Sequence, residues 1–207
     1  MSSIIVGGAA IIGNYGFRDS TMDIDAIIQA SSAMKDAIRM ISDRYSLPND
    51  WLNCDFTQTR SYTPKIVEFA RHYRTFSNIV HVRILAAEYM IAMKLMAGRA
   101  YKHDRSDVIG IIHEHQLSGL PITLEKIDKA VYDLYGGWSQ MPRESTDLIR
   151  DVFSNTNLSE LYTKYHDAEN EARSLLIKFN SQYPDALNED NLESILEQVA
   201  QKKAPQD

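Results

Sequence analysis

The sequence has almost no cysteine: Cys54 is the only one among 207 residues. A single cysteine excludes an intramolecular disulfide and a cysteine-rich zinc site. A reducing cytosol fits this composition best, so we expect a cytoplasmic protein. Long apolar runs are also missing, since none approaches the roughly 18 residues that a membrane span needs. The apolar stretch 4–12 is interrupted by Gly7-Gly8 and follows no basic region, which makes it a poor signal peptide. We therefore expect no membrane partner.

What is present suits a globular protein with strands first and helices later. Hydrophobic residues make up 44% of the chain and charged residues 24%, which is enough to bury a core. Apolar periodicity and turn residues give the expected elements. We expect strands at 3–6, 22–28, 66–69 and 79–85, and helices at 9–15, 31–45, 86–99, 104–115, 123–135, 158–179 and 191–201. This order predicts an α+β fold with a core of mixed strands and helices at 1–85 and a C-terminal helical lobe at 86–204.

The charge is unevenly distributed along the chain. The net charge is −6, yet residues 60–105 hold nine Lys or Arg against three Asp or Glu, a local charge of +6. The rest of the chain therefore carries −12. A basic segment inside an acidic protein indicates a site for a polyanion such as RNA. Chance clustering on a solvated face explains it equally well.

Two aspartates in the second expected strand are the main candidates for chemistry. Asp23 and Asp25 flank Ile24. Residues two apart on a strand point to the same face, so the carboxylates are expected side by side. Adjacent like charges are costly unless a cation neutralises them. Mg²⁺ suits that role because it prefers oxygen ligands and keeps waters and substrate phosphates as the others. An isolated pair of this kind is more often a solvated strand end.

A glycine pair before these aspartates makes the pattern more specific. Gly7 and Gly8 close the first expected strand. Glycines allow backbone N–H groups to approach a ligand closely. If a helix begins at Ala9, its N-terminus faces the same place and favours phosphate. A plain tight turn is the alternative for the glycines alone.

These features together resemble the first motif of the nucleotidyltransferase fold in the DNA-polymerase-beta-like superfamily. The segments most similar to families related to abortive-infection E toxins span roughly residues 4–115: Gly7-Gly8, Arg18, Thr21, Asp23-Ile24-Asp25, Leu47-Pro48, Trp51-Leu52-Asn53, Glu88 to Arg99, and Asp104 to Asp107. The resemblance implies that Asp23 and Asp25 hold Mg²⁺. It further implies that a nucleoside triphosphate (NTP) is bound by Gly7, Gly8, Arg18, Thr21 and Arg99.

Lys94 is a further candidate on independent grounds. Between Glu88 and Arg99, Lys94 is the only charged residue, and the other residues are apolar or small. A helix that is apolar on all sides is buried, and a buried lysine needs a partner. We expect that partner to be a carboxylate or a bound phosphate, although a lysine can also reach solvent along its stem. On this basis Lys94→Met should cost little stability.

The aspartates after Lys94 have a structural explanation. Asp104 can cap the helix that follows, and Asp107 then lies near the positive end of the helix dipole. Spacing alone favours the cap for Asp104. The resemblance implies instead that Lys94 and an aspartate of this segment, for which we favour Asp107, complete the catalytic site.

The sequence thus predicts an Mg²⁺-dependent nucleotidyltransferase that moves a nucleoside monophosphate from an NTP to an acceptor. The acceptor is expected to be RNA such as tRNA, or a protein. By the resemblance the enzyme is toxin-like, with a cognate antitoxin protein as a possible partner. The alternative is a catalytically silent nucleotide-binding or interaction protein that retains the fold.

Overall fold

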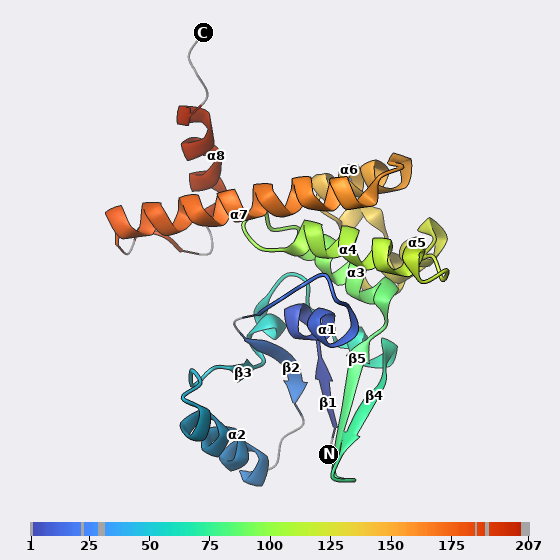
Figure 1. The fold of residues 1–207 in the computed structure, drawn as a ribbon, viewed down its shortest axis with the longest axis vertical. Helices are drawn as coiled ribbons and strands as arrows, with labels where there is room; N and C mark the ends of the chain where they lie inside the picture. The colour runs from blue at the N-terminus through green and yellow to red at the C-terminus, as the bar shows by residue number, and fades with distance from the viewer. Residues whose placement is uncertain (1, 22, 29–31, 185, 189–190, 204–207) are drawn as a thin grey trace.

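The computed structural model describes residues 2–21, 23–28, 32–184, 186–188 and 191–203. It shows the expected α+β architecture, a mixed sheet below a group of helices (Figure 1). The strands are β1 (Ser2–Ile5), β2 (Ile24–Ile28), β3 (Leu52–Asn53), β4 (Ala70–Phe76) and β5 (Val80–Leu85). The helices are α1 (Gly7–Asn14), α2 (Ser32–Tyr45), α3 (Ala87–Ala97), α4 (Asp104–Leu117), α5 (Leu124–Tyr135), α6 (Arg143–Ser154), α7 (Leu158–Gln182) and α8 (Leu192–Lys203). Short 3-10 helices span Asp55–Gln58, Pro64–Phe69 and Trp138–Gln140.

The sheet has the order β3-β2-β1-β5-β4. β1 is in the middle, antiparallel to β2 and parallel to β5. The chain turns from β1 straight into α1, which lies between the sheet and the helices above it (Figure 1). The end of β1 and the start of β2 therefore meet beside the N-terminus of α1.

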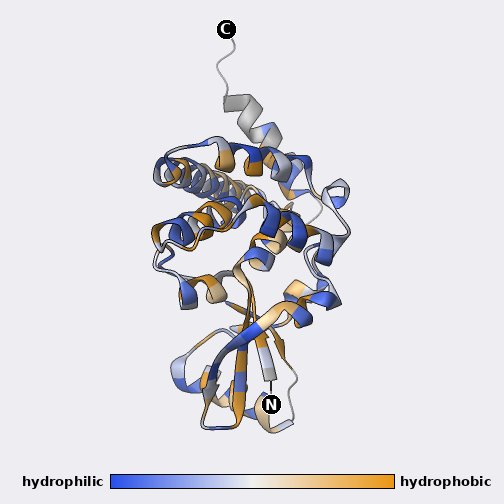
Figure 2. Ribbon diagram, turned by 90° about the vertical axis from the view of Figure 1, so that its right-hand side faces the viewer, coloured by the Kyte–Doolittle hydropathy of each residue, from blue (hydrophilic) through white to orange (hydrophobic). Residues whose placement is uncertain are grey.

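The core runs from the sheet into the helices. α3 is its centre, because Tyr89 to Met96 are all buried. One cluster of buried side chains joins Ile4 and Val6 of the β1 region to α3, and then to α4, α5 and α6. Apolar residues accordingly run through the middle of the molecule in Figure 2. The expected division of the chain at residue 85 coincides with the end of β5, and it stays a prediction.

Three local predictions need correction. Residues 66–69 form part of a 3-10 helix and not a strand, since Pro64 fixes the first turn in a helical conformation. The strand follows at Ala70–Phe76, where five of seven side chains are exposed and no apolar alternation signals it. α6 was also missed. By contrast, the predicted cap of α5 is confirmed, with Thr123 accepting a hydrogen bond from the Lys126 amide.

Most of the other boundaries differ from the expected ones by one to three residues, among them those of β2 and α2. β2 begins at Ile24, so Asp23 precedes the strand, and Met22 lies outside the described residues. α2 begins at Ser32, one residue later than expected. Within the described part of the chain, no helix combines the length and apolar character that crossing a membrane requires.

Candidate active site between the sheet and the helices

Asp23 and Asp25 lie together on one wall of a cavity of about 490 Å³. The backbone fixes their place, because the Val6 amide at the end of β1 donates to the Asp25 carbonyl at 3.0 Å. Within the described chain, neither carboxylate accepts a hydrogen bond or forms an ion pair. Burial raises the pKa of Asp25 above its ordinary value, and the charge of Asp23 raises it further. Two neighbouring carboxylates, one of which is hindered from ionising by burial and by the charge of the other, are an arrangement that a cation would stabilise.

Gly7 and Gly8 wrap the backbone around these carboxylates. Gly7 has a φ of +65°, and a Cβ there would lie 2.8 Å from Asp25 Oδ2. A Cβ on Gly8 would lie 2.7 Å from Thr21 Oγ1 and 2.8 Å from Arg18 Nη2. A side chain at either position would crowd these groups, and at Gly7 the left-handed conformation adds a backbone cost for any other residue.

These glycines open α1, and its N-terminus lies at the cavity. Val6 precedes the helix without a capping side chain, and the first turn holds no acidic residue. Val6, Gly7 and Gly8 all line the cavity. The first amides of a helix lack partners within the helix and favour an anion. The wall thus presents N–H donors beside two carboxylates.

The structure brings nearly all of the predicted site residues to this one cavity. Lys94, Arg99 and Asp104 line it from the helical side, opposite the wall formed by the glycines and aspartates. Arg18 and Thr21 reach it from the loop between α1 and β2. Asp107 is the exception, because it is buried behind the lining with 1% of its surface exposed.

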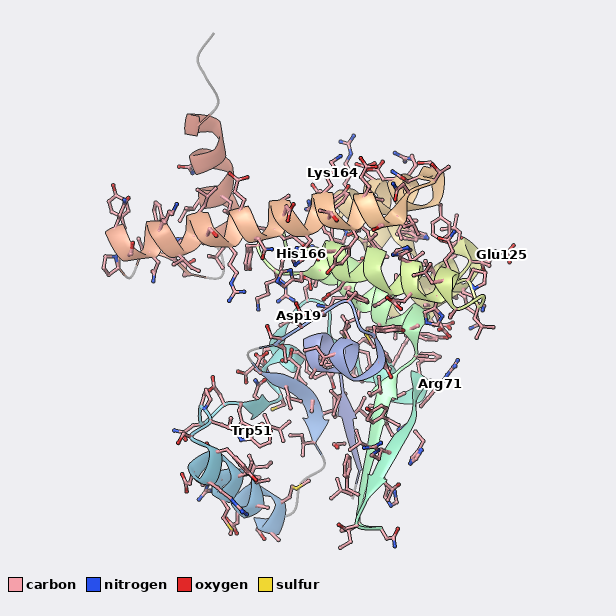
Figure 3. The ribbon with its side chains drawn as sticks, viewed as in Figure 1. Asp19, Trp51, Arg71, Glu125, Lys164 and His166 are labelled. Carbon is pink, nitrogen blue, oxygen red and sulfur yellow. The ribbon has the colours of Figure 1, made fainter. Side chains whose placement is uncertain are left out.

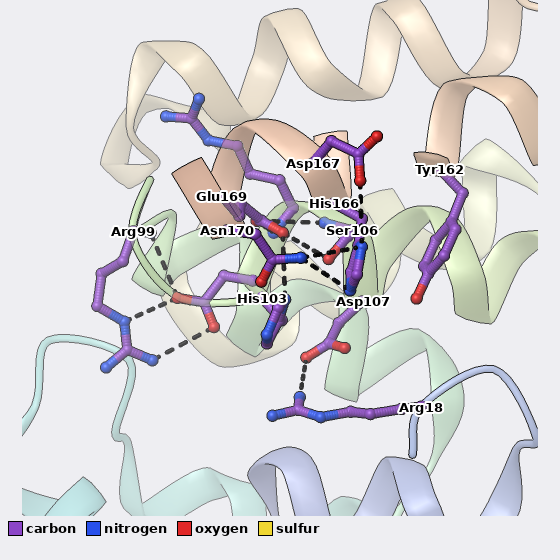
Figure 4. Close-up of polar contacts among 12 residues, drawn as sticks. Arg18, Arg99, His103, Ser106, Asp107, Tyr162, His166, Asp167, Glu169 and Asn170 are labelled. Carbon is purple, nitrogen blue, oxygen red and sulfur yellow. Dashed lines mark hydrogen bonds and ion pairs between the residues drawn. The ribbon is translucent and has the colours of Figure 1, made fainter. Parts of the chain in front are cut away.

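On the helical side the charges form a continuous chain of ion pairs. Lys94 Nζ lies 2.9 Å from Asp104 Oδ1 and 2.8 Å from Asp107 Oδ2. Arg99 Nε binds Asp104 at 2.7 Å, and Arg18 Nη1 binds Asp107 at 2.6 Å. Figure 4 shows Arg99 and Arg18 at the two ends of this arrangement. Lys94 thus has the carboxylate partner expected for a buried lysine, and it has two of them.

The shifts in pKa reflect this pairing. Burial opposes ionisation of Asp104, yet Lys94 and Arg99 hold its pKa well below the ordinary value. Burial likewise opposes the charge on Lys94, but Asp104 and Asp107 raise its pKa overall. Lys94, Arg99 and Asp104 are therefore charged at neutral pH. On the opposite wall, by contrast, the ionised form of Asp25 is disfavoured.

The capping role predicted for Asp104 is wrong. Asp104 is the first residue of α4, and its carboxylate is used by Lys94 and Arg99. The free amides of α4 are satisfied from another helix: Glu169 of α7 accepts from the Arg105 amide at 2.8 Å and from the Ser106 amide at 3.3 Å. Asp107 does lie in the first turn, as expected.

Several cavity residues were not predicted from the sequence. They come from three places: the 3-10 segment after β3, the loop between α3 and α4, and α7. They are Asp55, Phe56, Thr59, Ser61, Tyr101, Lys102, His103 and Arg173. Lys102 and His103 adjoin the Asp104 motif, so that neighbourhood offered a signal. The sequence offered no signal for Arg173, because only the packing of α7 against α4 brings this side chain near the cavity.

Lys102 differs from the other cations of the site. Within the described residues its ammonium makes no hydrogen bond or ion pair. Burial and the nearby Arg99 lower its pKa, while Asp104, Asp23 and Asp25 act in the opposite direction. Lys102 is therefore a cation near the unpaired carboxylates that is not already committed to a partner.

The basic segment 60–105 does not form one surface. Lys94, Arg99 and Lys102 line the cavity, whereas Arg71 on β4 pairs with Glu88 at 3.3 Å. In Figure 3, Arg71 lies on the far side of the sheet from the loop that carries Asp19. The local excess of positive charge is thus split between the cavity and the outer strand.

Comparison with known protein families agrees with this geometry. The model of a family described as a nucleotidyltransferase of unknown function (DUF6036) matches residues 1–173. The chain belongs to this family. The match covers the sheet, the turn at Gly7-Gly8, the aspartate pairs Asp23/Asp25 and Asp104/Asp107, and α7 as far as Arg173. It confirms the predicted nucleotidyltransferase fold. No curated protein and no solved structure matches the chain. The likeness to abortive-infection E toxins stays a prediction.

Proposed function

We propose that this nucleotidyltransferase-family protein is an active enzyme that transfers a nucleoside monophosphate from an Mg²⁺-bound NTP to an acceptor hydroxyl. The observation that carries the proposal is the unpaired carboxylate pair, Asp23 and Asp25, beside the bare N-terminus of α1 in one cavity. Carboxylates without partners fit a cation, and free helix amides fit a phosphate. An Mg²⁺–triphosphate complex supplies both charges at once.

The residues present fit Mg²⁺. Asp25 is partly buried and costly to ionise alone, and no basic side chain pairs with it within the described chain. No group of three or more His, Cys, Asp or Glu that could hold a metal occurs among the described residues. A protein site of two carboxylates matches the habit of Mg²⁺ to complete its shell with water and substrate phosphates. When bound, Mg²⁺ would neutralise phosphate charge and lower the pKa of the attacking hydroxyl.

The chain's own groups have distinct tasks in this proposal. Asp23 and Asp25 hold the metal, and the Gly7 and Gly8 amides bind the β- and γ-phosphates. Thr21 packs against Gly8 and positions that turn. Fixed donors at the phosphates stabilise the charge that develops on the leaving pyrophosphate.

The cations divide into two kinds. Lys94 and Arg99 are held by Asp104, and Arg18 by Asp107. We propose that Arg18 and Arg99, which line the cavity, add a contact to the triphosphate while keeping these partners. Lys94, with Asp107 behind it, sets the position of the helical wall and contributes a fixed positive potential. Lys102 is the cation available for direct contact with the reacting phosphates.

Transfer assays test this function. We expect label from an α-phosphate-labelled NTP mixture to appear on macromolecules when the protein is incubated with Mg²⁺, total RNA and total cellular protein. Asp25→Asn should reduce transfer by at least about a hundredfold, the scale for losing one preorganised catalytic charge. Asp43→Asn on the exposed α2 removes the same charge elsewhere and serves as the control. Binding of Mg²⁺–NTP without any transfer would instead support a silent nucleotide-binding protein.

We propose RNA as the acceptor, supported by Arg99, Lys102 and Arg173 at the cavity. Phosphate contacts by Lys and Arg dominate affinity for nucleic acids and make it salt-dependent. Lys102→Ala should therefore weaken RNA binding and reduce its salt dependence. The double variant Arg71→Ala, Arg74→Ala removes charge from β4 and should have the smaller effect. Absence of RNA binding at low salt, with label on protein, would make a protein the acceptor.

The toxin-like role rests on the resemblance to abortive-infection E toxins. We propose on that basis that a cognate antitoxin protein neutralises the enzyme. Expression of the wild type should then arrest growth, while expression of Asp25→Asn should not. Equal growth with both forms would contradict the toxin role and leave the transfer reaction unaffected.

A further inference from the structure

A second cluster of polar side chains lies where α4 begins under α7. Its centre is the buried carboxylate of Glu169, which is 3% exposed. Glu169 accepts hydrogen bonds from the Arg105 and Ser106 amides and from Ser106 Oγ at 2.5 Å. The first residue before α4, His103, faces the same carboxylate, with Nδ1 at 3.7 Å from Glu169 Oε2. None of the roles proposed above uses this pair.

The ring of His103 is held in place on several sides. It stacks on the ring of His166 with centroids 5.1 Å apart and planes 18° apart. His166 stacks in turn on Tyr162 at 5.5 Å. Figure 4 shows the His103 ring below Glu169, between Arg99 and Arg18. A ring fixed by stacking and by a buried carboxylate is oriented before any ligand arrives.

The two ring nitrogens of His103 have different surroundings. Nδ1 is buried without a hydrogen-bond partner in the described chain, and Glu169 Oε2 lies 3.7 Å from it. A carboxylate beside one imidazole nitrogen places the proton on that nitrogen and leaves a lone pair on the other. Nε2 is not among the buried unsatisfied atoms, and His103 lines the cavity that holds Asp23 and Asp25. Since Nδ1 is on the Glu169 side of the ring, we infer that Nε2 and its lone pair are on the cavity side.

We propose that His103 is the general base that takes the proton of the acceptor hydroxyl, with Glu169 as its positioning residue. This inference rests on the proposed function. The acceptor O–H bond breaks and its proton moves to His103 Nε2, while the acceptor oxygen forms a bond to the α-phosphorus. The bond from that phosphorus to the β-phosphate oxygen breaks, and pyrophosphate leaves with the electron pair. Glu169 stabilises the imidazolium, and the proton passes to solvent before the next turnover.

The distance of 3.7 Å fits this role. It exceeds a hydrogen bond but lies within ion-pair range. Contacts of catalytic bases are often long without substrate and shorten when the complex forms. A positive charge on the ring draws Nδ1 towards Glu169. Asp104, which is paired with Lys94, is one of several charged side chains that line the same cavity as His103. The others are Arg18, Asp23, Asp25, Asp55, Lys94, Arg99, Lys102 and Arg173.

The chain offers a matched control for this histidine. His166 belongs to the same stack but lies outside the cavity lining, with 36% of its side chain exposed. His103→Gln and His166→Gln therefore make the same chemical change in two rings that stack on each other, and each variant removes that stacking contact. Loss of a general base costs about 10²–10⁴-fold in rate. We expect kcat of His103→Gln to fall in that range, with the KM and Kd for Mg²⁺–NTP unchanged. In His166→Gln kcat should fall far less, because that variant removes one stacking contact and leaves both the base and Glu169 in place.

Two further readouts separate a base from a structural residue. The pH–rate profile of the wild type should lose activity on the acidic side as His103 becomes protonated, and His103→Gln should lack that limb. Added imidazole should restore part of the activity of His103→Ala, because a free base can enter the space left by the ring. It should not restore the activity of Asp25→Asn.

The experiment compares these proteins with labelled NTPs, Mg²⁺, total RNA and total cellular protein as acceptors. The expected result is a low kcat for His103→Gln, intact nucleotide binding and rescue of His103→Ala by imidazole. Wild-type kcat in His103→Gln, or nucleotide binding lost in parallel with activity, would overturn the assignment. Failure of the proposed function is distinguishable, because the wild type itself would then transfer no label.

Discussion

The two walls of the cavity treat charge in opposite ways. On the helical wall, Lys94 lies between Asp104 and Asp107, and each aspartate has an arginine as a second partner. On the sheet wall, Asp23 and Asp25 stand next to each other without a partner in the described chain. One wall lowers the pKa of its aspartate and the other raises it. The first satisfies its charges internally, whereas the second leaves charge to be satisfied by a ligand.

The comparison indicates that the paired charges of the helical wall stabilise the fold. The carboxylates of the sheet wall, by contrast, lower stability and leave charge available for a ligand. Breaking a buried ion pair leaves an uncompensated charge and is strongly destabilising. Removing one of two repelling carboxylates relieves a cost. When a charged side chain is removed, stability and activity should therefore change in the same direction on the helical wall and in opposite directions at Asp23 and Asp25.

Lys94→Met gives the largest expected effect. The variant leaves Asp104 and Asp107 buried with fewer partners, so the free energy of unfolding should fall by about 3–5 kcal/mol. This reverses the expectation from sequence that Met would cost little, because Lys94 has two buried carboxylate partners that Met would leave uncompensated. Urea unfolding measures the change, and Lys102→Met is the control, since Lys102 forms no ion pair with the described residues. Equal stability of the two variants would contradict the paired character of the helical wall.

Gly7→Ala tests the close approach on the sheet wall. A positive φ costs an L-residue about 1–2 kcal/mol, and the new Cβ would also meet Asp25 Oδ2 at 2.8 Å. Gly119→Ala is a matched control, because Gly119 has a φ of +74° and open space around it. Thermal unfolding should show a loss in both variants. Only Gly7→Ala should also lose Mg²⁺–nucleotide binding. Unchanged binding by Gly7→Ala would contradict a role for the glycine turn in holding the nucleotide.

Asp25→Asn should give the smallest change in stability and one of opposite sign. The pKa of Asp25 is raised in the folded state, so the folded protein gains stability as pH falls and Asp25 is protonated. At neutral pH the ionised carboxylate carries the full cost. The amide should therefore raise the free energy of unfolding at neutral pH, by less than Lys94→Met lowers it. Melting temperatures measured across pH should show that Asp25→Asn is more stable than the wild type at neutral pH and that this difference shrinks as pH falls. A lower melting temperature of Asp25→Asn than of the wild type at neutral pH would contradict this prediction.

The sequence predicted the sheet wall because its signals are local. Gly7, Gly8, Asp23 and Asp25 are close in sequence, and the resemblance rests on them. β4 escaped detection because its side chains are mostly exposed and show no alternation. The true partners of Asp104 depend on the packing of α3 against α4, and capping was the better explanation from spacing alone. Glu169 and Arg173 reach the site only through the docking of α7.

Calorimetric titration with Mg²⁺–NTP tests the central claim most directly, namely that the unpaired carboxylates of the sheet wall are the ligand site. The proteins to compare are the wild type, Asp25→Asn and the charge-matched Asp43→Asn, each checked for folding by thermal unfolding. The account predicts binding by the wild type and by Asp43→Asn, and strongly weakened binding by an Asp25→Asn protein that is at least as stable. Binding of Mg²⁺–NTP by Asp25→Asn as tightly as by the wild type would contradict it.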